Sequence, residues 1–353
     1  MKIIVNGRFL LHRITGVERY ARELLLELDR IIESEEIILA VPPETKHIPQ
    51  YKNIRVIKIG KLHNQMWEHI SFSLYVRKQK GISLNLCNVA PLFSPGVVCI
   101  HDVKIKATPQ YFSKKFLMWY ELLFWNATKR AKAIITVSQF SKDEILKYYR
   151  ISPDKITVIP NAWQHYERIG YDENALEKYG LKKEQYFFSM CSLEPNKNFQ
   201  WIAKVAKQRP NQVFAVSGSI NEKVFADGLG FECPNNMKLL GYVSDEEAKT
   251  LMRDCKAFLF PTYYEGFGIP PLEAISAGAR QVVVSDTKVM HEVFGDSVMY
   301  IDPNVYDMGD IGDQIADRAV LETYSWKESA KKLMNLLKQL ESKSGQDNEK
   351  KNM

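Results

Sequence analysis

The sequence predicts an α/β protein built from two doubly wound domains. Its 353 residues exceed the roughly 250–300 residues at which a single core stops growing, so two domains are expected. Short β-branched runs alternate with helical stretches over the first 161 residues, which is typical of a parallel sheet with helical crossovers. The alternation resumes after a polar interval near 162–184, which indicates a second sheet of the same kind.

The first half of the chain provides the strands and helices of one such sheet. A helix is expected over 16–32, because apolar residues recur every three or four positions and form one face: Val17, Tyr20, Leu24 and Leu28. Strands are expected at 2–7, 36–42, 54–60, 83–88, 97–102, 133–138 and 156–161, and further helices at 67–79, 114–131 and 141–149.

The second half repeats this order and ends in a long helix. Strands are expected at 185–192, 212–219, 237–243, 257–262, 281–286 and 298–302, and the last helix begins after a capping Ser325. The polar end of the chain lacks aromatic residues and is expected to be disordered. The expected divisions are 1–165 for the first domain, 166–324 for the second, 325–341 for the last helix and 342–353 for the tail.

Composition excludes several classes of protein. Hydrophobic residues make up 45% and charged residues 25% of the chain, an ordinary globular mixture. No apolar run reaches the roughly 18 residues of a transmembrane helix, and the start has no pattern of a signal peptide. The five scattered cysteines contain no C-x-x-C pair, so neither a disulfide framework nor a zinc site is expected, and a reducing cytoplasm fits best.

The positive charge is concentrated in the first half. Residues 1–165 carry 25 Lys and Arg against 14 Asp and Glu, whereas the remainder carries 23 against 28. Such asymmetry indicates either an anionic partner or a lysine-rich solvated surface. No helix-turn-helix, zinc finger or aromatic RNP-like sheet is present, so no nucleic acid is expected as the partner.

The segment 261–278, "PTYYEGFGIPPLEAISAG", has the pattern of a loop that leads into a helix. Gly266 and Gly268 permit positive φ and close approach of a ligand to the backbone. The following Pro-Pro pair suits the first turn of a helix, and Gly278 is its expected stop. The loop follows an expected strand, and ligands of doubly wound sheets bind at the carboxyl ends of strands, here in a cleft between two facing domains.

Two carboxylates flank the start of this helix. Glu265 is expected in the loop, where it would contact ligand alone, and Glu273 in the first helical turn, with the helix N-terminus between them as an anion site. Carboxylates accept hydrogen bonds from paired sugar hydroxyls. A nucleotide-sugar has the matching layout, because its diphosphate lies between a sugar and a ribose. The alternative is that Glu273 only complements the helix dipole and Glu265 only occupies a surface turn.

The segment resembles the motif of two glutamates with seven residues between them that is found in retaining glycosyltransferases of family 4, which have the two-Rossmann GT-B fold. The similarity covers about residues 1–340 and is closest to bacterial mannosyltransferase-like members that build surface polysaccharide or lipopolysaccharide. Further matching segments are "TGVERYARELL", "IHDVKIKATP", "TVSQFSKDEI", "VIPNAW", "SLEPNKNFQ", "GYVSDEEAKTLMRDCKAFLFPTYYEGFG" and "HEVFGDSVMYIDP". The resemblance implies a first domain that binds the acceptor, a second that binds the nucleotide-sugar, and a last helix that crosses back to the first.

The resemblance also assigns roles to single residues. It makes three residues catalytic: Glu265 at the donor sugar, Lys197 at the diphosphate and His101 beside the transferred sugar. Glu273 would hold the ribose. The remaining residues that the resemblance assigns to donor binding lie in five loops: Gly16; Ser192 and Asn196; Gly218; Tyr242 and Val243; and Gly266, Phe267, Gly268 and Ile269.

The chain departs from the family at the diphosphate. The family often supplies an Arg there, at the position of Ser192 or Asn196, so Lys197 is the cation that remains. Arg13 or Arg19, on either side of Gly16, is the candidate to replace it. The chain contains no Asp-x-Asp tripeptide, so we expect no cofactor and no metal, with retention by attack on the face that the leaving group vacates.

The expected enzyme is thus a metal-independent, retaining hexosyltransferase. GDP-mannose is the first donor, with dTDP-rhamnose and UDP-sugars as alternatives, and the acceptor is a glycan or a lipid-linked oligosaccharide. A glycosidase is one rival, and a catalytically silent sugar-nucleotide-binding subunit is another.

Residues 111–133 are rich in aromatic and basic residues, so they either contact an anionic membrane or pack as a crossover helix. The expected location is the cytoplasm, with peripheral attachment to the inner face of the cytoplasmic membrane.

Overall fold

The computed structural model describes residues 2–192, 194–218 and 233–351, with side chains up to 342. It divides the chain into two compact units, Met1–Asn161 with Ser325–Met353, and Ala162–Tyr324. The first division thus falls at Asn161 rather than at the expected 165. Each unit is a Rossmann-like parallel sheet with helices, so the predicted α/β fold class is confirmed.

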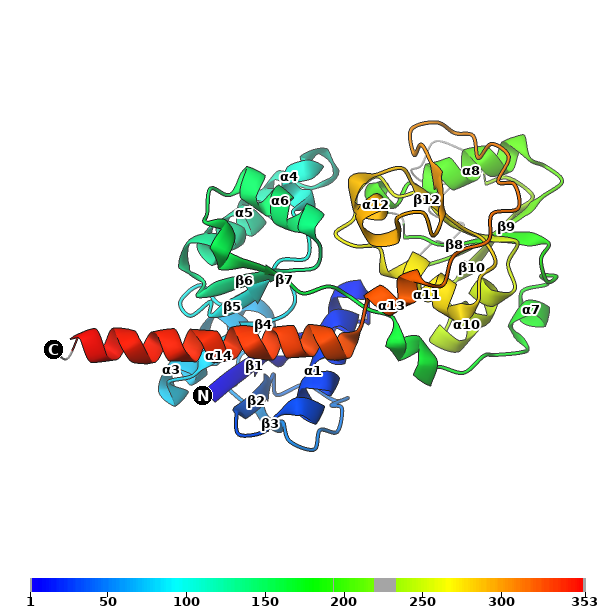
Figure 1. Cartoon of the computed structure of the whole chain (residues 1–353). Coiled ribbons are helices and arrows are strands. Elements are labelled where there is room, and N and C mark those ends of the chain that lie inside the picture. The colour runs from blue at the N-terminus through cyan, green and yellow to red at the C-terminus, as the bar shows by residue number, and fades with distance from the viewer. Residues whose placement is uncertain (1, 193, 219–232, 352–353) are drawn as a thin grey trace. The chain divides into compact units, whose positions relative to one another are not determined.

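The first unit contains a seven-stranded parallel sheet with the order β3-β2-β1-β4-β5-β6-β7 (Figure 1). Its inner strands are almost entirely buried, as expected for a parallel sheet covered on both faces, whereas the edge strand β3 is exposed or half-buried. The strands are β1 (Lys2–Asn6), β2 (Glu36–Val41), β3 (Arg55–Lys58), β4 (Ile82–Asn85), β5 (Val97–Cys99), β6 (Ala133–Thr136) and β7 (Ile156–Val158).

The helices of this unit follow the predicted alternation. The apolar face predicted for the first helix is confirmed, since Tyr20, Leu24 and Leu28 are fully buried. The helical segments are η1 (Gly7–Leu11), α1 (Gly16–Ile31), α2 (Asn64–Met66), η2 (Trp67–Phe72), α3 (Ser73–Gln79), α4 (Lys104–Ala107), η3 (Pro109–Tyr111), α5 (Lys114–Arg130), α6 (Gln139–Tyr148), η4 (Pro153–Lys155) and α14 (Trp326–Lys351).

One expected helix is interrupted. The stretch predicted as a single helix over 67–79 begins as the π-helix η2 and continues as the α-helix α3. Trp67 is fully buried, and its indole N–H donates to the carbonyl of Ile59 at 2.8 Å. Single π-turns within helices are frequent at functional sites, and this one carries the buried Glu68.

The last helix packs on α1 within the first unit (Figure 1). Ser325 caps it, because its Oγ accepts a hydrogen bond from the Glu328 amide at 3.4 Å. The tail was expected to be disordered from 342, but α14 continues to Lys351. Its Lys, Glu and Gln residues are good helix formers, so the helix does not end at 341. Residues 352–353 lie outside the described part.

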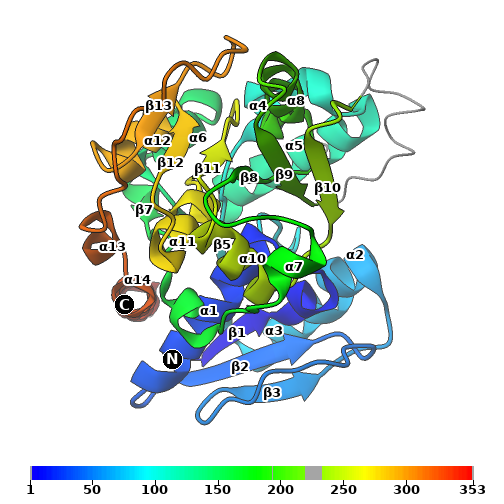
Figure 2. The ribbon, with the colours of Figure 1, turned by 90° about the vertical axis from the view of Figure 1, so that its right-hand side faces the viewer.

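The second unit contains a six-stranded parallel sheet with the order β10-β9-β8-β11-β12-β13 (Figure 2). Its strands are β8 (Tyr186–Met190), β9 (Val213–Ser217), β10 (Met237–Gly241), β11 (Ala257–Phe260), β12 (Val282–Ser285) and β13 (Met299–Ile301). The predicted end of the second strand of this sheet, Ser219, lies outside the described residues.

Helices connect these strands as the alternation predicts. They are η5 (Gln164–Arg168), α7 (Ala175–Lys178), η6 (Pro195–Lys197), α8 (Phe199–Gln208), α10 (Asp245–Arg253), α11 (Ile269–Ala277), α12 (Lys288–Phe294) and α13 (Val320–Thr323). The polar interval near 162–184 belongs to this unit, and it buries His165 and Tyr166.

In each sheet, the first strands are added one after another toward one edge, and the later strands are added toward the other edge. In the first unit the switch point between these two directions lies between β1 and β4, and in the second between β8 and β11. Crevices at the carboxyl ends of such strand pairs are the usual ligand sites of doubly wound sheets. No helix in the described part of the chain is long and apolar enough to cross a bilayer.

Candidate active site

Three loops at the carboxyl edge of the second sheet are joined by hydrogen bonds. The loop after β8 meets the end of β9, where the Cys191 amide donates to the Ser217 carbonyl at 2.8 Å. It also meets the loop after β11, where the Tyr263 amide donates to the Asn196 carbonyl at 2.8 Å. The side-chain amide of Asn196 adds a longer hydrogen bond to the Tyr264 carbonyl, at 3.4 Å. The loops on both sides of the switch point therefore form one structure.

Gly218 is the residue that permits this closeness after β9. Its φ is +140°, and a Cβ at this position would lie 1.9 Å from the Cys191 carbonyl oxygen. Its amide also donates to the Gly241 carbonyl at 2.8 Å. A glycine is therefore required where β9 ends, beside Ser192 and the start of the loop that carries Tyr242.

Lys197 and Glu265 come together across the switch point. Lys197 ends η6, which follows β8, and Glu265 lies in the loop after β11; Nζ and Oε1 are 2.7 Å apart. Burial would lower the pKa of Lys197, but the Glu265 carboxylate raises it above its usual value, so the ammonium stays charged at neutral pH. The expectation that Glu265 contacts ligand alone is wrong, because its carboxylate also binds this ammonium.

The N-terminus of α11 begins directly after this pair. Gly268 is its N-cap with φ +97°, and Gly278 ends it with φ +96°, as the glycine positions predicted. Pro270 and Pro271 have no amide hydrogen, so the donors that remain at this end are the amides of Gly268 and Ile269. These two amides and the positive end of the helix dipole favour an anion.

Glu273 was expected in the first turn of α11, but it is the fifth residue of this helix. The reason is that the helix begins at Ile269, one residue before the prolines. Glu273 Oε1 lies 2.7 Å from Nε2 of His165, and both side chains are buried (9% and 1% exposed). No pattern in the sequence indicated His165, which lies in the interval interpreted as a polar connection between domains.

The other residues assigned to donor binding differ in exposure. Tyr242 is 74% exposed, whereas Val243 is buried. Phe267 is buried against Tyr324 with the two ring centroids 5.0 Å apart, so only its backbone remains for a ligand. Two further hydroxyls at the same edge are buried: Ser217 Oγ and Thr262 Oγ1, which have no hydrogen-bond partner among the described residues. Buried polar atoms without partners are uncommon and often mark a ligand or water position.

Two of the predicted site residues belong to the first unit. Gly16 is the exposed first residue of α1. His101 is buried after β5, where its Nε2 lies 2.8 Å from the Leu86 carbonyl and its amide donates to Asn88 Oδ1 at 2.7 Å. Burial lowers the pKa of His101, so the ring is neutral at pH 7 and Nε2 carries the proton that it donates to Leu86.

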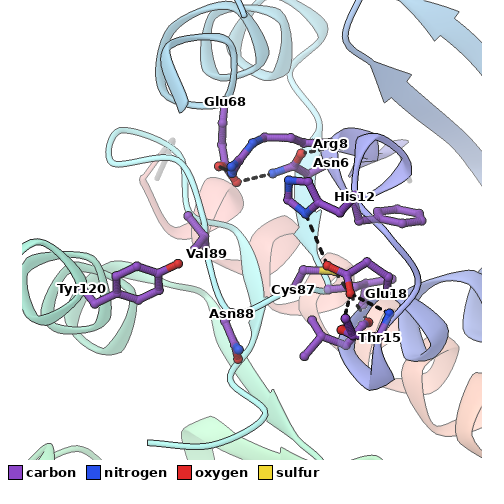
Figure 3. Close-up of a pocket in the computed structure, with 13 residues that line it drawn as sticks. Asn6, Arg8, His12, Thr15, Glu18, Glu68, Cys87, Asn88, Val89 and Tyr120 are labelled. Carbon is purple, nitrogen blue, oxygen red and sulfur yellow. Dashed lines mark hydrogen bonds and ion pairs between the residues drawn. The ribbon is translucent and has the colours of Figure 1, made fainter. Parts of the chain in front are cut away.

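A pocket of about 210 Å³ lies at the switch point of the first sheet (Figure 3). Residues that follow β1 line one part of it and residues that follow β4 line another, while η2 and α5 each contribute one polar side chain. The lining consists of Asn6, Arg8, Phe9, His12, Thr15, Val17, Glu18, Glu68, Leu86, Cys87, Asn88, Val89 and Tyr120. Of the predicted site residues, none lines this pocket, although Gly16 lies between two that do.

A buried carboxylate organises one wall of the pocket. Glu68 accepts from Asn6 Nδ2 through one oxygen and from Arg8 Nη1 through the other, each at 2.6 Å. The Arg8 amide in turn donates to Asn6 Oδ1 at 3.2 Å. Asn6 Nδ2 also donates to Asn85 Oδ1 at 3.1 Å, so the network extends into β4 and holds the three side chains in place.

A second carboxylate, Glu18, also lines the pocket (Figure 3). Glu18 accepts from the amide of Thr15 at 3.1 Å and lies 3.3 Å from Nδ1 of His12. Burial would raise the pKa of Glu18, but the hydrogen bonds from His12 and Thr15 lower it, so it is a carboxylate at neutral pH. Burial raises the pKa of Tyr120, which projects from α5 and stays a neutral phenol. The pocket thus offers several acceptors and donors to a ligand rich in hydroxyl groups.

These pocket residues were missed from sequence, although part of the signal was present. Asn6 and Asn88 lie at the carboxyl ends of expected strands, close to the loops in which binding residues were anticipated. Glu68 stands in the run "MWEHISF", where a charged residue within an aromatic, buried stretch is unusual. In the described residues, no group of three or more His, Cys, Asp and Glu is arranged to hold a metal ion. The absence of a metal in the reaction stays a prediction.

Comparison with known proteins identifies the class. Residues 172–353 match the family Glycosyl transferases group 1, and residues 14–163 match Glycosyltransferase Family 4. In structure, the chain is similar to sucrose-phosphate synthase of Thermosynechococcus elongatus, with a TM-score of 0.71, 13% identity and coverage of 97% of this chain and 99% of the other. It is similar to HepE of Anabaena in complex with UDP and glucose, with a TM-score of 0.69, 15% identity and coverage of 96% and 100%.

The protein is therefore a glycosyltransferase of the GT-B fold. It belongs to the group 1 family of glycosyl transferases, with a first part of Family 4 type. O-antigen chain mannosyltransferase B of Escherichia coli is 26% identical over 94% of this chain and 93% of its own length. O-antigen chain mannosyltransferase RfbU of Salmonella typhimurium is 26% identical over 86% of this chain and 87% of its own length.

Proposed function

We propose that the protein transfers a mannosyl unit from GDP-mannose to a glycan or lipid-linked oligosaccharide in the synthesis of a bacterial surface polysaccharide. Family membership supports glycosyl transfer, and the names of the O-antigen mannosyltransferases support mannose. The observation that carries the donor site is the Lys197–Glu265 pair beside the N-terminus of α11.

Lys197 of the pair and the N-terminus of α11 both bind the diphosphate of the donor. Lys197 Nζ has three hydrogens, of which one serves Glu265, so two remain for diphosphate oxygens. The amides of Gly268 and Ile269 add donors and the helix dipole adds positive potential. Fixed positive groups at the leaving diphosphate stabilise the charge that develops on it in the transition state.

Glu265 has a second task in this proposal. One carboxylate oxygen holds Lys197, and the other accepts from hydroxyls of the donor sugar. Glu273 accepts from ribose hydroxyls through the oxygen that His165 does not engage. His165 thereby acts as a positioning residue, because it fixes the carboxylate and contacts no donor.

We propose that transfer proceeds with retention and without a metal. The acceptor attacks the face of the sugar that the diphosphate vacates, and a phosphate oxygen takes the proton of the acceptor hydroxyl. Lys197 and the α11 amides then supply the charge stabilisation that a divalent ion provides in other transferases. The pocket of the first unit, with Glu18, Glu68 and Tyr120, receives the acceptor sugar through its hydroxyl groups.

A thermal-shift screen tests the donor assignment. GDP, UDP, ADP and dTDP are compared alone and as nucleotide-sugars, because a ligand that binds only the native state raises the melting temperature by mass action. We expect the largest shift with GDP-mannose and a much smaller one in Lys197→Met. Lys207→Met, an exposed lysine on α8 of the same unit, is the matched control and keeps the wild-type shift.

Two outcomes would change the proposal. A larger shift with UDP-sugars or dTDP-rhamnose would replace mannose and leave glycosyl transfer in place. Product formation is measured by NMR with a library of mannosylated acceptors. A thermal shift without any product would favour the silent binding subunit. The same NMR assay reports the anomeric configuration of the product, and an inverted product would refute retention.

A further inference from the structure

The first unit exposes a stripe of large apolar side chains on its second helical segment. Met66, Ile70 and Leu74 are 59%, 41% and 58% exposed. They are spaced by four residues from the end of α2 through η2 into α3, so they lie on one side of this continuous helical stretch. The opposite side, with Trp67, Phe72 and other residues, is buried.

A second stripe of the same kind runs along α5. Met118, Leu122 and Trp125 are 74%, 45% and 52% exposed, and their spacing of four and three residues places them on one face. The opposite face of α5 packs into the core through Phe124 and Ala127. In a folded unit, the exposed face of an amphipathic helix normally carries polar residues, so the exposed apolar residues of α5 need an explanation.

The two stripes belong to neighbouring elements. His69 of η2 and Trp119 of α5 meet with ring centroids 5.6 Å apart, and the pocket is lined by both elements through Glu68 and Tyr120 (Figure 3). We name the six exposed residues of the two stripes the apolar face: Met66, Ile70, Leu74, Met118, Leu122 and Trp125. Phe93, which is 64% exposed, lies next to Leu92, whose carbonyl accepts from Asn126 of α5.

Positive charge is concentrated in the part of the sequence that carries the apolar face. Residues 61–132 carry 11 Lys and Arg against 3 Asp and Glu, so most of the excess of residues 1–165 lies here. Lys114 and Lys115 occupy the first turn of α5, where the helix dipole disfavours cations and where no acidic residue is present. Helix stability therefore does not explain these lysines, whereas an anionic partner does.

The second unit shows no comparable arrangement among its described residues. Its exposed large apolar residues are Tyr171, Tyr242, Val305 and Ile315, which come from separate loops and share no element. Scattered exposed apolar residues are normal on a protein surface, but two adjacent stripes with a basic surround mark an interaction surface. The charge selects the partner, because a surface that is apolar and basic matches a bilayer with anionic headgroups.

We propose that the apolar face docks on an anionic lipid bilayer. The six side chains enter the boundary between headgroups and acyl chains, and the basic residues at both ends of α5, Lys114, Lys115, Lys129 and Arg130, contact the headgroups. Tyr120 leaves α5 on another side of the helix and lines the pocket, so docking places the pocket about one helix diameter, roughly 10 Å, from the bilayer. An acceptor attached to a lipid can reach the pocket at that distance.

Vesicle sedimentation with the full chain tests the docking. The vesicles contain phosphatidylcholine alone or a mixture with phosphatidylglycerol, and no donor is added. We expect binding to the anionic vesicles that weakens with salt. Met118→Ser/Trp125→Ser is expected to lower the partition coefficient by roughly tenfold or more, because two exposed apolar side chains are lost. Lys114→Gln/Lys115→Gln is expected to lower it by about fivefold for each lysine.

The controls distinguish docking through the apolar face from nonspecific adhesion and from self-association. Val305→Ser/Ile315→Ser removes two similarly exposed apolar side chains from the second unit and is expected to bind like the wild type. Equal binding to neutral vesicles, or wild-type binding by both face variants, would overturn the proposal. Light scattering that shows a dimer in the wild type and a monomer in Met118→Ser/Trp125→Ser would assign the face to a second copy of the chain instead.

The outcome is independent of the proposed transfer chemistry. Nucleotide binding is measured on the same face variants by thermal shift, and an unchanged shift shows that they are folded. Failure to bind vesicles with an intact nucleotide response therefore refutes the docking alone.

Discussion

His165 and Glu273 lie 108 positions apart in the sequence, yet Nε2 and Oε1 meet at 2.7 Å in the second unit. A buried carboxylate needs such a partner, because burial without hydrogen bonds is costly. The contact gives Glu273 a structural task beside the proposed contact with ribose. A substitution at this position therefore changes stability as well as nucleotide binding, and the two effects have to be measured separately.

Glu273→Ala is expected to lower the free energy of unfolding by about 1–3 kcal/mol, since it leaves the ring nitrogen of His165 buried without its partner. Glu273→Gln keeps an acceptor oxygen and is expected to lose less than half as much. Urea unfolding followed by tryptophan fluorescence measures both, and Glu322→Ala, an exposed glutamate on α13, is the matched control. Unfolding of Glu273→Ala at the wild-type urea midpoint would show that the contact contributes nothing.

Among the individual elements, α14 returns the chain to the first unit and buries one face against it. Trp326, Ala330, Leu333 and Leu337 are at most 1% exposed, and Ser329 Oγ donates to the Pro160 carbonyl at 2.8 Å. The burial recurs every three or four residues, so the helix is held by packing rather than by its ends. This packing explains why the last helix belongs to the first unit although it follows the second in sequence.

Leu337→Ala is expected to destabilise the first unit by about 2–5 kcal/mol, because it leaves a cavity at a position with no exposure. Asn335→Ala, an exposed position on the same helix, is expected to change the free energy of unfolding by less than about 0.5 kcal/mol. Hydrogen exchange of α1 and α14 amides reports where the loss occurs. Equal exchange rates in wild type and Leu337→Ala would contradict the packing described.

The packing of α14 has a pH dependence of defined sign. Burial would raise the pKa of Glu35, but Lys338 of α14, 3.0 Å away, and nearby backbone amides lower it from 4.5 to about 2. The folded-state pKa lies below the unfolded one, so the contribution is present above pH 4.5 and is lost as the pH falls toward 2. Lys338→Met is therefore expected to lose less stability than the wild type between pH 5 and pH 3 in urea titrations.

Across the whole molecule, one topological rule places both candidate sites. The Lys197–Glu265 pair lies between the loops of β8 and β11, and the polar pocket lies between the loops of β1 and β4. In each sheet these are the neighbouring strands at which the direction of addition reverses. Loops that leave such a pair in opposite directions open a crevice, and each unit fills it with polar side chains.

The complete reaction is expected to survive the removal of divalent metal ions. Lys197 and the α11 amides are proposed to provide the charge stabilisation at the diphosphate, so dialysis against EDTA should leave the initial rate of mannosyl transfer within about twofold of the untreated enzyme. Radiolabelled product formation measures the rate. A large loss that magnesium or manganese restores would show that a metal takes part.

The two sheets, the order of their elements and the family could all be predicted from the sequence. Parallel strands buried on both faces need near-continuous apolar runs, and helices need a period near 3.6, so both patterns are visible without a structure. The loop into α11 was also predictable, because Gly268 and Gly278 occupy positions with positive φ that other residues rarely adopt. Each of these features depends on a short stretch of neighbouring residues.

The pairing of distant side chains, in contrast, became visible in the folded chain alone. Folding paired Lys197 with Glu265 and His165 with Glu273, and it gathered Asn6 and Arg8 around Glu68 at one pocket. These pairings join residues 60 to 108 positions apart in the sequence. Folding also left His101 bonded to a carbonyl and outside the lining of that pocket. Such contacts depend on strand order and on the rotation of each helix about its axis, and no local pattern encodes either quantity.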